Sequence, residues 1–288
     1  MISNEKQTVT QLTQYIASLF KEKGMLINDI TVQKIIYQIK MDLGINHPLY
    51  DKLPYYWYYY GPYCELITES FNDFAPSSKN LFSLNNIKLG TEYEIIDEFP
   101  ELIDLGENLL DKGNYIYKDL TEDIYKNHAP FDIIYPFKYG IFNQTENDNL
   151  MISGDDYVKL FRQCQLKLIQ LYDIREFSTI FTTLTRQIDL INDSDKINEC
   201  WSLLKSSIRN SWFTFAKGLR LYAHDSYYDA CFEKWGLTFK YSLEKLEKEI
   251  IDLIDNTFDS INHYDNYKYT DSQKRILDST VGAYLRDD

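Results

Sequence analysis

The sequence lacks the short signatures by which many enzymes are recognised. Its 288 residues contain no GxGxxG, GxxxxGK[ST], HExxH or GxSxG pattern, so motifs of nucleotide binding, zinc proteolysis and serine hydrolysis are missing. No stretch approaches the roughly 18 uninterrupted apolar residues that a membrane span needs, and the first residues lack an apolar signal-peptide core. We therefore expect a cytoplasmic, non-enzymatic protein that needs no cofactor and binds no membrane.

Cysteine is scarce, and its spacing does not suit a zinc site. Gaps of 100, 36 and 31 residues separate the four cysteines, which are Cys64, Cys164, Cys200 and Cys231. Acidic residues gather between positions 92 and 101, but such groups are more often solvated faces than divalent-ion sites. We expect buried, reduced thiols and no bound metal.

Arginine is absent from the first 161 residues, and the whole chain carries a net charge of −14. Residues 1–150 carry a net charge of −10 and residues 151–288 a net charge of −4. Because nucleic-acid binding needs clustered Lys and Arg, this balance disfavours a broad DNA-binding face in the first half. An acidic surface suits a basic protein partner instead, since opposite charges steer two proteins together.

Proline is absent from the last 152 residues, whereas all seven prolines occur by Pro136. Because proline is excluded from helix interiors and favours turns, we expect short mixed elements in the first half and long helices in the second. The sequence predicts an α+β, mostly helical fold. Its parts are an N-terminal helical domain with a small strand or hairpin element at 1–142, a polar linker at 143–154 and an all-α helical bundle at 155–288.

The first half contains two amphipathic helices. Residues 8–23 repeat apolar side chains every three or four positions, at Val9, Leu12, Ile16 and Phe20. A second helix is expected to begin after the cap residue Thr31 and to end at Gly44. Residues 63–71 predict a further helix.

A run of six aromatic residues at 55–60 predicts a strand that a Gly-Pro turn at 61–62 closes. In a strand, alternate residues share a face, so we expect Tyr56, Tyr58 and Tyr60 to lie together. At least one aromatic face then needs cover, from the protein's own core or from a partner.

The second half predicts at least four helices, which an up-and-down bundle arranges most economically. The expected ranges are 155–172, 174–192, 194–223 and 243–262. A last helix is expected to open at Thr270, where Gln273 three residues later completes a capping box.

Three motifs of the first half occur in an order that is typical of one protein family. A K-x-x-Y helix is followed by a strand that ends in Tyr-Gly-Pro and then by a helix that ends in His-Ala-Pro-Phe. Residues 8 to about 138 therefore resemble the Panacea (SocA-like) antitoxin domain family. The residues that carry the resemblance are Lys34, Tyr37, Tyr60, Gly61, Pro62, His128, Pro130 and Phe131. For His128 we favour a simpler role near a helix C-terminus, where a protonated ring complements the helix dipole.

The resemblance implies a non-enzymatic antitoxin of a toxin–antitoxin system, which neutralises its protein partner by masking it. We expect the partner to bind exposed members of one aromatic set, with Lys34 and Tyr37 beside them. That set is Tyr56, Tyr58, Tyr60 and Tyr63. Aromatic anchors of this kind supply much of the affinity at protein interfaces.

A second interpretation stays open, a winged-helix-like DNA-binding transcriptional regulator of the kind associated with phages or defence. Helix, helix and strand can be the plan of a winged helix, and basic and aromatic residues interleave at 200–224. The candidate nucleic-acid face is Lys205, Arg209, Lys217 and Arg220. An amphipathic bundle helix whose basic face is exposed to solvent explains the same pattern, and we favour that explanation.

Overall fold

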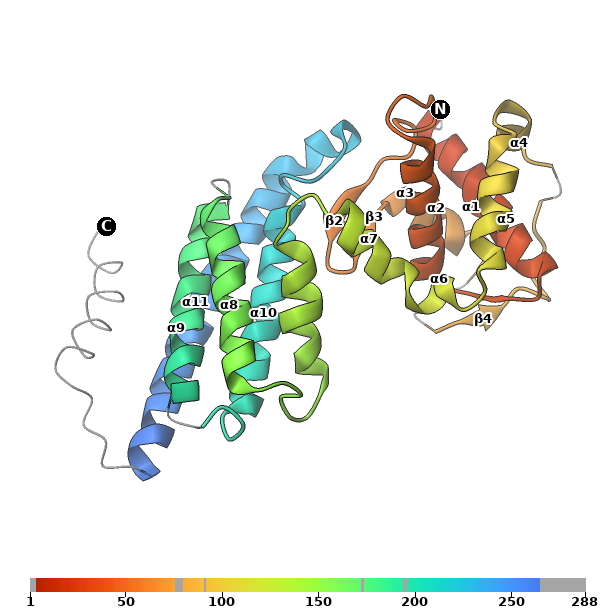
Figure 1. Cartoon of the computed structure of the whole chain (residues 1–288). Helices are drawn as coiled ribbons and strands as arrows, with labels where there is room; N and C mark the ends of the chain where they lie inside the picture. The colour runs from red at the N-terminus through yellow and green to blue at the C-terminus, as the bar shows by residue number, and fades with distance from the viewer. Residues whose placement is uncertain (1–3, 76–79, 91, 172–173, 194–195, 265–288) are drawn as a thin grey trace.

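Two groups of helices lie side by side with a β-hairpin between them, as Figure 1 shows. The computed structural model describes residues 4–75, 80–90, 92–171, 174–193 and 196–264. The first group comprises α1 (Asn4–Glu22), β1 (Leu26–Ile27), α2 (Asp29–Leu43), β2 (Tyr56–Tyr58), β3 (Gly61–Tyr63), α3 (Glu65–Asn72), β4 (Phe82–Ser83), α4 (Glu94–Glu98), α5 (Glu101–Asp111), α6 (Tyr115–Lys118) and α7 (Leu120–His128). The second comprises the π-helix η1 (Pro136–Ile141), the 3-10 helices η2 (Phe142–Glu146) and η4 (Ser226–Cys231), and the α-helices α8 (Gly154–Ile169), α9 (Arg175–Asp193), α10 (Trp201–Leu219) and α11 (Phe232–Tyr264). The prediction of a mostly helical α+β fold is confirmed.

The first two helices bury the faces that their periodicity predicts. All four apolar residues singled out on α1 are fully buried. The expected cap of α2 was wrong: Asn28 precedes the helix, and its side chain accepts hydrogen bonds from the backbone N–H and hydroxyl of Thr31, at 2.9 and 2.7 Å. Thr31 therefore lies inside the first turn, because the extended backbone of Asn28 gives the better capping geometry. Gly44, with a φ of +78°, ends α2 as predicted.

The aromatic strand forms a hairpin rather than leading directly into a helix. β2 and β3 pair antiparallel, with Tyr56 opposite Tyr63 and Tyr58 opposite Gly61. The expectation that the helix starts at residue 63 was therefore wrong, since residues 61–63 form the second strand. Gly61 has a φ of +88°, which lets the chain turn back after Tyr60.

The bundle follows the predicted plan, although two helix boundaries differ. α10 begins at Trp201 and ends at Leu219, inside the predicted range of 194–223. α11 begins at Phe232, eleven residues before the predicted 243, because Trp235 and Phe239 are buried and continue the helix toward the hairpin. The predicted last helix from Thr270 lies outside the described residues.

Backbone hydrogen bonds join the hairpin to the chain between α10 and η4. The Trp57 N–H donates to the Ala223 carbonyl, and the Asp225 N–H donates to the Tyr55 carbonyl, both at 2.8 Å. Tyr56 and His224 are also paired as an isolated antiparallel bridge. A short piece of the second half thus extends the hairpin like a third strand, which places β2 directly against the bundle.

Limited proteolysis tests the predicted linker at 143–154. η1 precedes this segment, η2 occupies its start, and both already belong to the second group of helices, so the two groups meet between α7 and η1 rather than at residue 142. Between η2 and α8 the chain runs as an irregular segment in which Asp148, Asn149 and Met151 are exposed. We expect chymotrypsin to cut first beside Leu150 or Met151, since loops are nicked before helices. The two fragments should stay together on size exclusion, because the hairpin is bonded to residues 223–225. Early cleavage within 31–131 instead, with the 143–156 window resistant, would contradict the linker.

Candidate functional site

The residues of the Panacea-like motifs meet where the hairpin crosses α2 and α7. The Lys34 ammonium donates a hydrogen bond to the Pro62 carbonyl oxygen at 3.0 Å. A Cβ atom at Gly61 would lie 2.9 Å from Cε2 of Tyr125 and 3.4 Å from Nζ of Lys34. Because the backbone approaches both side chains this closely, the position requires glycine. These contacts hold the second strand of the hairpin on α2.

Tyr37 and His128 complete this motif cluster. The Tyr37 ring meets the rings of Trp57 and His128 edge-on, with centroids 6.3 Å away in both cases. His128 ends α7, but burial lowers the pKa of its imidazole, which favours the neutral ring over the protonated one expected from the sequence. Pro130 is exposed beyond the helix, whereas Phe131 packs partly buried against the core.

Lys34 and Tyr37 lie in the interior, with exposed fractions of 3% and 6%. Burial lowers the pKa of the Lys34 ammonium to about 7, an effect that Asp29 opposes and Lys138 reinforces. Neither side chain reaches the surface, so both support the hairpin from the interior of the protein. A partner cannot contact them in this conformation.

Lys34 should make the stability of the protein depend on pH. Its pKa of about 7 in the folded state lies below its ordinary value of 10.5, so between these values the unfolded chain binds more protons. Stability should therefore rise as the pH is raised from 7 to 9, with a slope of at most about 1.4 kcal/mol per pH unit from this group. Urea unfolding at both pH values should show this gain, reduced in Lys34→Met. An equal gain in both proteins would contradict the assignment.

The aromatic strand is shorter than the predicted range of 55–60. β2 ends at Tyr58, so Tyr60 lies in the turn and only Tyr56 and Tyr58 share a strand face. Tyr56 is 3% exposed, because its ring packs against Tyr228 and Trp235 with centroids 4.8 Å away from each. Tyr58 is half-buried, and Tyr60 is 51% exposed. The bundle thus covers the start of β2, whereas Tyr60 in the turn is open to solvent.

The hairpin tip, which we define as Tyr58, Tyr59 and Tyr60, is fixed to the bundle through its backbone. The indole N–H of Trp212 on α10 donates to the Tyr59 carbonyl at 3.2 Å. The Tyr59 ring stacks on the Tyr58 ring with centroids 3.8 Å apart. Tyr63 lies at the other end of the hairpin, half-buried against Tyr56, and therefore belongs to the covered part.

Two cationic side chains flank the hairpin tip. The Arg220 guanidinium lies over the Tyr58 ring, with its central carbon 5.0 Å from the ring centroid, and over the Trp235 ring at 5.1 Å. The Lys138 ammonium lies 5.9 Å from the centroid of Tyr60. Burial lowers the pKa of Lys138 to about 8. The tip is therefore an aromatic surface with a positive group on either side.

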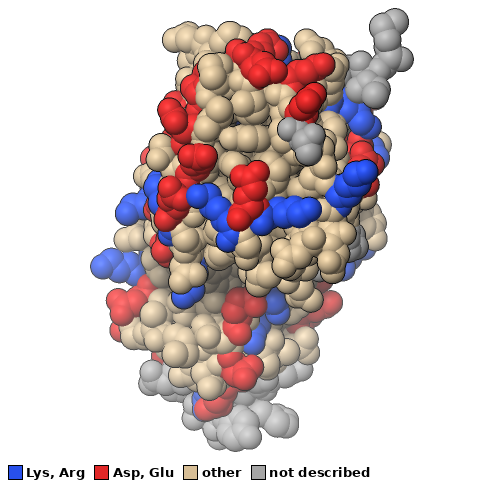
Figure 2. Space-filling view, turned by 90° about the vertical axis from the view of Figure 1, so that its right-hand side faces the viewer, with Lys and Arg blue, Asp and Glu red and all other residues tan. Residues whose placement is uncertain are grey.

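The four residues of the candidate nucleic-acid face do not form an open basic surface. Lys205 and Arg209 form ion pairs with acidic residues of the segment before α8, at 3.9 and 3.1 Å. Lys217 donates to the Ser242 hydroxyl at 2.6 Å, and Arg220 is only 7% exposed. Figure 2 looks onto the first group of helices, at the other end of the molecule from α10, and there too basic side chains are interspersed with acidic ones.

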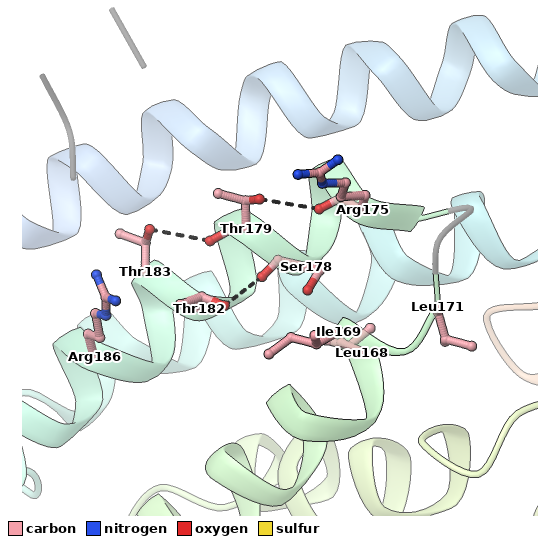
Figure 3. Close-up of a pocket in the computed structure, with 9 residues that line it drawn as sticks. All are labelled: Leu168, Ile169, Leu171, Arg175, Ser178, Thr179, Thr182, Thr183 and Arg186. Carbon is pink, nitrogen blue, oxygen red and sulfur yellow. Dashed lines mark hydrogen bonds between the residues drawn. The ribbon is translucent and has the colours of Figure 1, made fainter. Parts of the chain in front are cut away.

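A groove of about 470 Å³ runs along α9 beside the end of α8 (Figure 3). Arg175 and Arg186 stand toward its two ends, with serine and threonine side chains between them. The hydroxyls of Thr179, Thr182 and Thr183 donate to carbonyls four residues earlier, at 2.8 to 3.4 Å. Because these hydroxyl protons are already engaged by the helix, the groove is not assigned a ligand.

Among the described residues, no group of three or more His, Cys, Asp or Glu side chains is arranged to hold a metal ion. None of the described helices is long and apolar enough to cross a membrane. Burial raises the pKa of Cys64 to about 11 and that of Cys164 to about 12, so both thiols are held protonated. All four cysteines are free, and Cys64, Cys164 and Cys200 are buried as predicted, whereas Cys231 is only partly buried.

The structure joins residues that the sequence presented as two unrelated candidates. Tyr58 of the aromatic strand and Arg220 of the basic helix are in contact. Sequence reasoning missed Lys138 and Trp235, since no local pattern distinguishes them from core and surface residues. The likeness to the Panacea family stays a prediction that rests on the motif residues, because no family model, no curated protein and no solved structure matches this chain.

Proposed function

We propose that this protein is a non-enzymatic, antitoxin-like binding protein that neutralises a protein partner by covering it. The observation that carries the proposal is the open turn of the hairpin, where Tyr60 is 51% exposed and Tyr58 and Tyr59 are half-buried. Large aromatic side chains bring much contact area and few rotatable bonds to an interface. The resemblance of the motif residues to an antitoxin family supports the same function.

The hairpin is held rigidly against the bundle, which favours the binding of a partner. The Tyr59 carbonyl accepts the Trp212 indole N–H, and the strand before it is bonded to the chain after α10. An anchor that is already held in place loses little entropy when a partner binds. Masking of a partner needs such a rigid surface and requires no reaction.

Affinity capture tests the proposal. The full chain should retain a protein from lysate of its native host, and that protein should slow growth when expressed alone and not when co-expressed with this chain. Tyr60→Ala should weaken the complex by about 1–4 kcal/mol, since the side chain is the exposed anchor, while circular dichroism stays native. The readout is the dissociation constant measured with the purified partner.

Tyr241→Ala is the matched control for this experiment. Tyr241 lies on α11 and is 70% exposed, so its loss removes a similar side chain from a different surface. The free energy with which this variant binds the partner should lie within about 0.5 kcal/mol of the wild-type value. Equal losses for both variants would contradict the role of the hairpin tip. Binding of duplex DNA with steep salt dependence, and capture of no protein, would favour the transcriptional regulator instead.

A further inference from the structure

Arg220 is a buried cation without an anion. Its side chain is 7% exposed, and among the described residues no group forms an ion pair or a hydrogen bond with its guanidinium. Its Nε atom is enclosed and has no hydrogen-bond partner, whereas its two terminal nitrogens are not enclosed, so a ligand can reach them from outside. The rings of Tyr58 and Trp235 lie against it at 5.0 and 5.1 Å, and the C-terminal end of α10 also favours positive charge there. These contacts stabilise the charge, but they leave the N–H donors unused.

Such an arrangement is costly for the free protein. Burial removes water from a charged group, and a buried charge is normally compensated by an ion pair with hydrogen bonds. An acidic group that binds the remaining N–H donors of the fork would supply that compensation. The position therefore gains most from a ligand that carries a carboxylate.

Lys138 repeats this arrangement on the other side of the hairpin tip. Its ammonium lies 3.8 Å from the ring centroid of Phe142, 5.4 Å from that of Trp212 and 5.9 Å from that of Tyr60. No acidic side chain within the described ranges forms an ion pair with it, although Glu146, which pairs with Arg209, attracts its charge and partly opposes the effect of burial on its pKa. Lys138 contacts Trp212, and Arg220 follows eight residues later at the end of α10, so the two cations lie against positions about two turns apart on that helix.

These two cations stand out in a chain whose net charge is −14. The overall charge predicts a basic partner, whereas the charges at the hairpin tip favour the opposite sign at the point of contact. Tyr60, which is half exposed beside Lys138, offers an aromatic surface against which the same segment of a partner can pack.

We propose that the hairpin tip binds an acidic segment of a protein partner, with one carboxylate on Arg220, another on Lys138 and the tyrosine rings packed between them. The inference rests on the proposed masking function, because it specifies which part of the partner is held. It assigns to Arg220 a protein carboxylate in place of the nucleic-acid phosphate considered from the sequence.

Titration of the full chain with short peptides tests the proposal directly. The probe is an acetylated, amidated tetraglutamate peptide, and its neutral counterpart is the matching tetraglutamine peptide. The readouts are the NMR signals of the Arg220 Nε–H and of the Trp235 indole N–H, assigned with Arg220→Lys and Trp235→Phe. Tetraglutamate should shift both signals saturably at concentrations up to about 10 mM, and tetraglutamine should not. Absence of a saturable shift with tetraglutamate would overturn the proposal.

Three charge-removing variants locate the binding site. Arg220→Gln and Lys138→Gln should each weaken tetraglutamate binding about fivefold or more. Arg162→Gln removes the same charge from α8 at an exposed ion pair with Asp189 and should change binding less than about twofold. If Arg220→Gln does not fold, Lys138→Gln still provides the comparison, since Lys138 is only partly buried. Equal effects of all three variants would overturn the proposal.

The outcomes separate this inference from the proposed function. A captured partner that Tyr60→Ala releases, but that Arg220→Gln and Lys138→Gln leave bound, would overturn the acidic contact and keep the masking function. Tetraglutamate binding without any captured protein would support the charge assignment and contradict the function. An oligothymidylate that binds these residues more tightly than tetraglutamate does would overturn the inference in favour of a nucleic acid.

Discussion

Replacing Asp225 by alanine should lower the free energy of unfolding by about 3–5 kcal/mol. Asp225 is the ion-pair partner of Lys40, whose ammonium lies 2.6 Å from the Asp225 Oδ2 atom and 2.7 Å from the Leu53 carbonyl oxygen. Lys40 is 2% exposed, so the substitution leaves a buried ammonium without its anion. The Tyr55 N–H, which donates to the same carboxylate at 2.8 Å, loses its acceptor as well.

The pair joins the two halves of the chain, which makes the effect larger than that of a surface ion pair. Lys40 comes from α2 and Asp225 from the segment between α10 and η4, 185 residues later. The Asp225 carboxylate also accepts the Tyr55 N–H at the start of the hairpin. Loss of the carboxylate should therefore weaken the attachment of the hairpin to the bundle. Fragments produced by cleavage near residue 150 should separate more easily in this variant.

Urea unfolding followed by circular dichroism and tryptophan fluorescence measures the loss. Lys40→Met combined with Asp225→Ala should be more stable than Asp225→Ala alone, because the double variant buries no unpaired charge. The matched control is Glu146→Ala, which breaks an exposed pair with Arg209 and should cost less than about 1 kcal/mol. An Asp225→Ala protein within about 1 kcal/mol of wild type would show that the pair contributes little.

Local periodicity was sufficient to predict the helices whose burial is set by their own sequence. Val9, Leu12, Ile16 and Phe20 repeat at helical spacing, and all are buried as expected. The bundle helices α8 and α9 also begin and end within a few residues of their predicted ranges. These elements were predictable because an amphipathic helix carries its packing direction in neighbouring residues.

Elements shaped by distant residues were not predictable in the same way. Residues 61–63 continue as a strand because Gly61 turns the chain back and Lys34 binds the Pro62 carbonyl. α11 starts early because Trp235 packs against Tyr56, far away in the sequence. Tertiary contacts override local propensity in both cases.

The candidate site likewise contains residues that local sequence predicts and a contact that it does not predict. The aromatic strand was predictable from the run at 55–60, and the basic residues from the composition of 200–224. The predicted common face of Tyr56, Tyr58 and Tyr60 was wrong, because the chain turns after Tyr58. The contact between the strand and the basic helix was not predictable, since Tyr58 meets Arg220 only through the folding of the hairpin onto α10. The charge of the bound group can therefore be inferred only from the structure, in which the hairpin and α10 lie together.

Gly61→Val should destabilise the protein by more than the strain of its backbone angle. Gly61 has a φ of +88°, a region that a β-branched residue enters only with strain of about 1–3 kcal/mol. A side chain there would also start 2.9 Å from the Tyr125 ring, which is itself 1% exposed and packed against Trp57. Because the ring has little room to move, overpacking should add about another 1–3 kcal/mol.

Gly113→Val separates these two contributions. Gly113 has a φ of +57°, but a Cβ atom there would have no neighbour within 4 Å, so the substitution introduces backbone strain alone. Thermal and urea unfolding should rank the proteins as wild type, Gly113→Val and Gly61→Val in order of falling stability. Equal losses in the two variants would show that Tyr125 yields to the new side chain. An unchanged melting temperature for Gly61→Val would contradict the turn itself, and with it the placement of the hairpin tip beside Arg220 and Lys138.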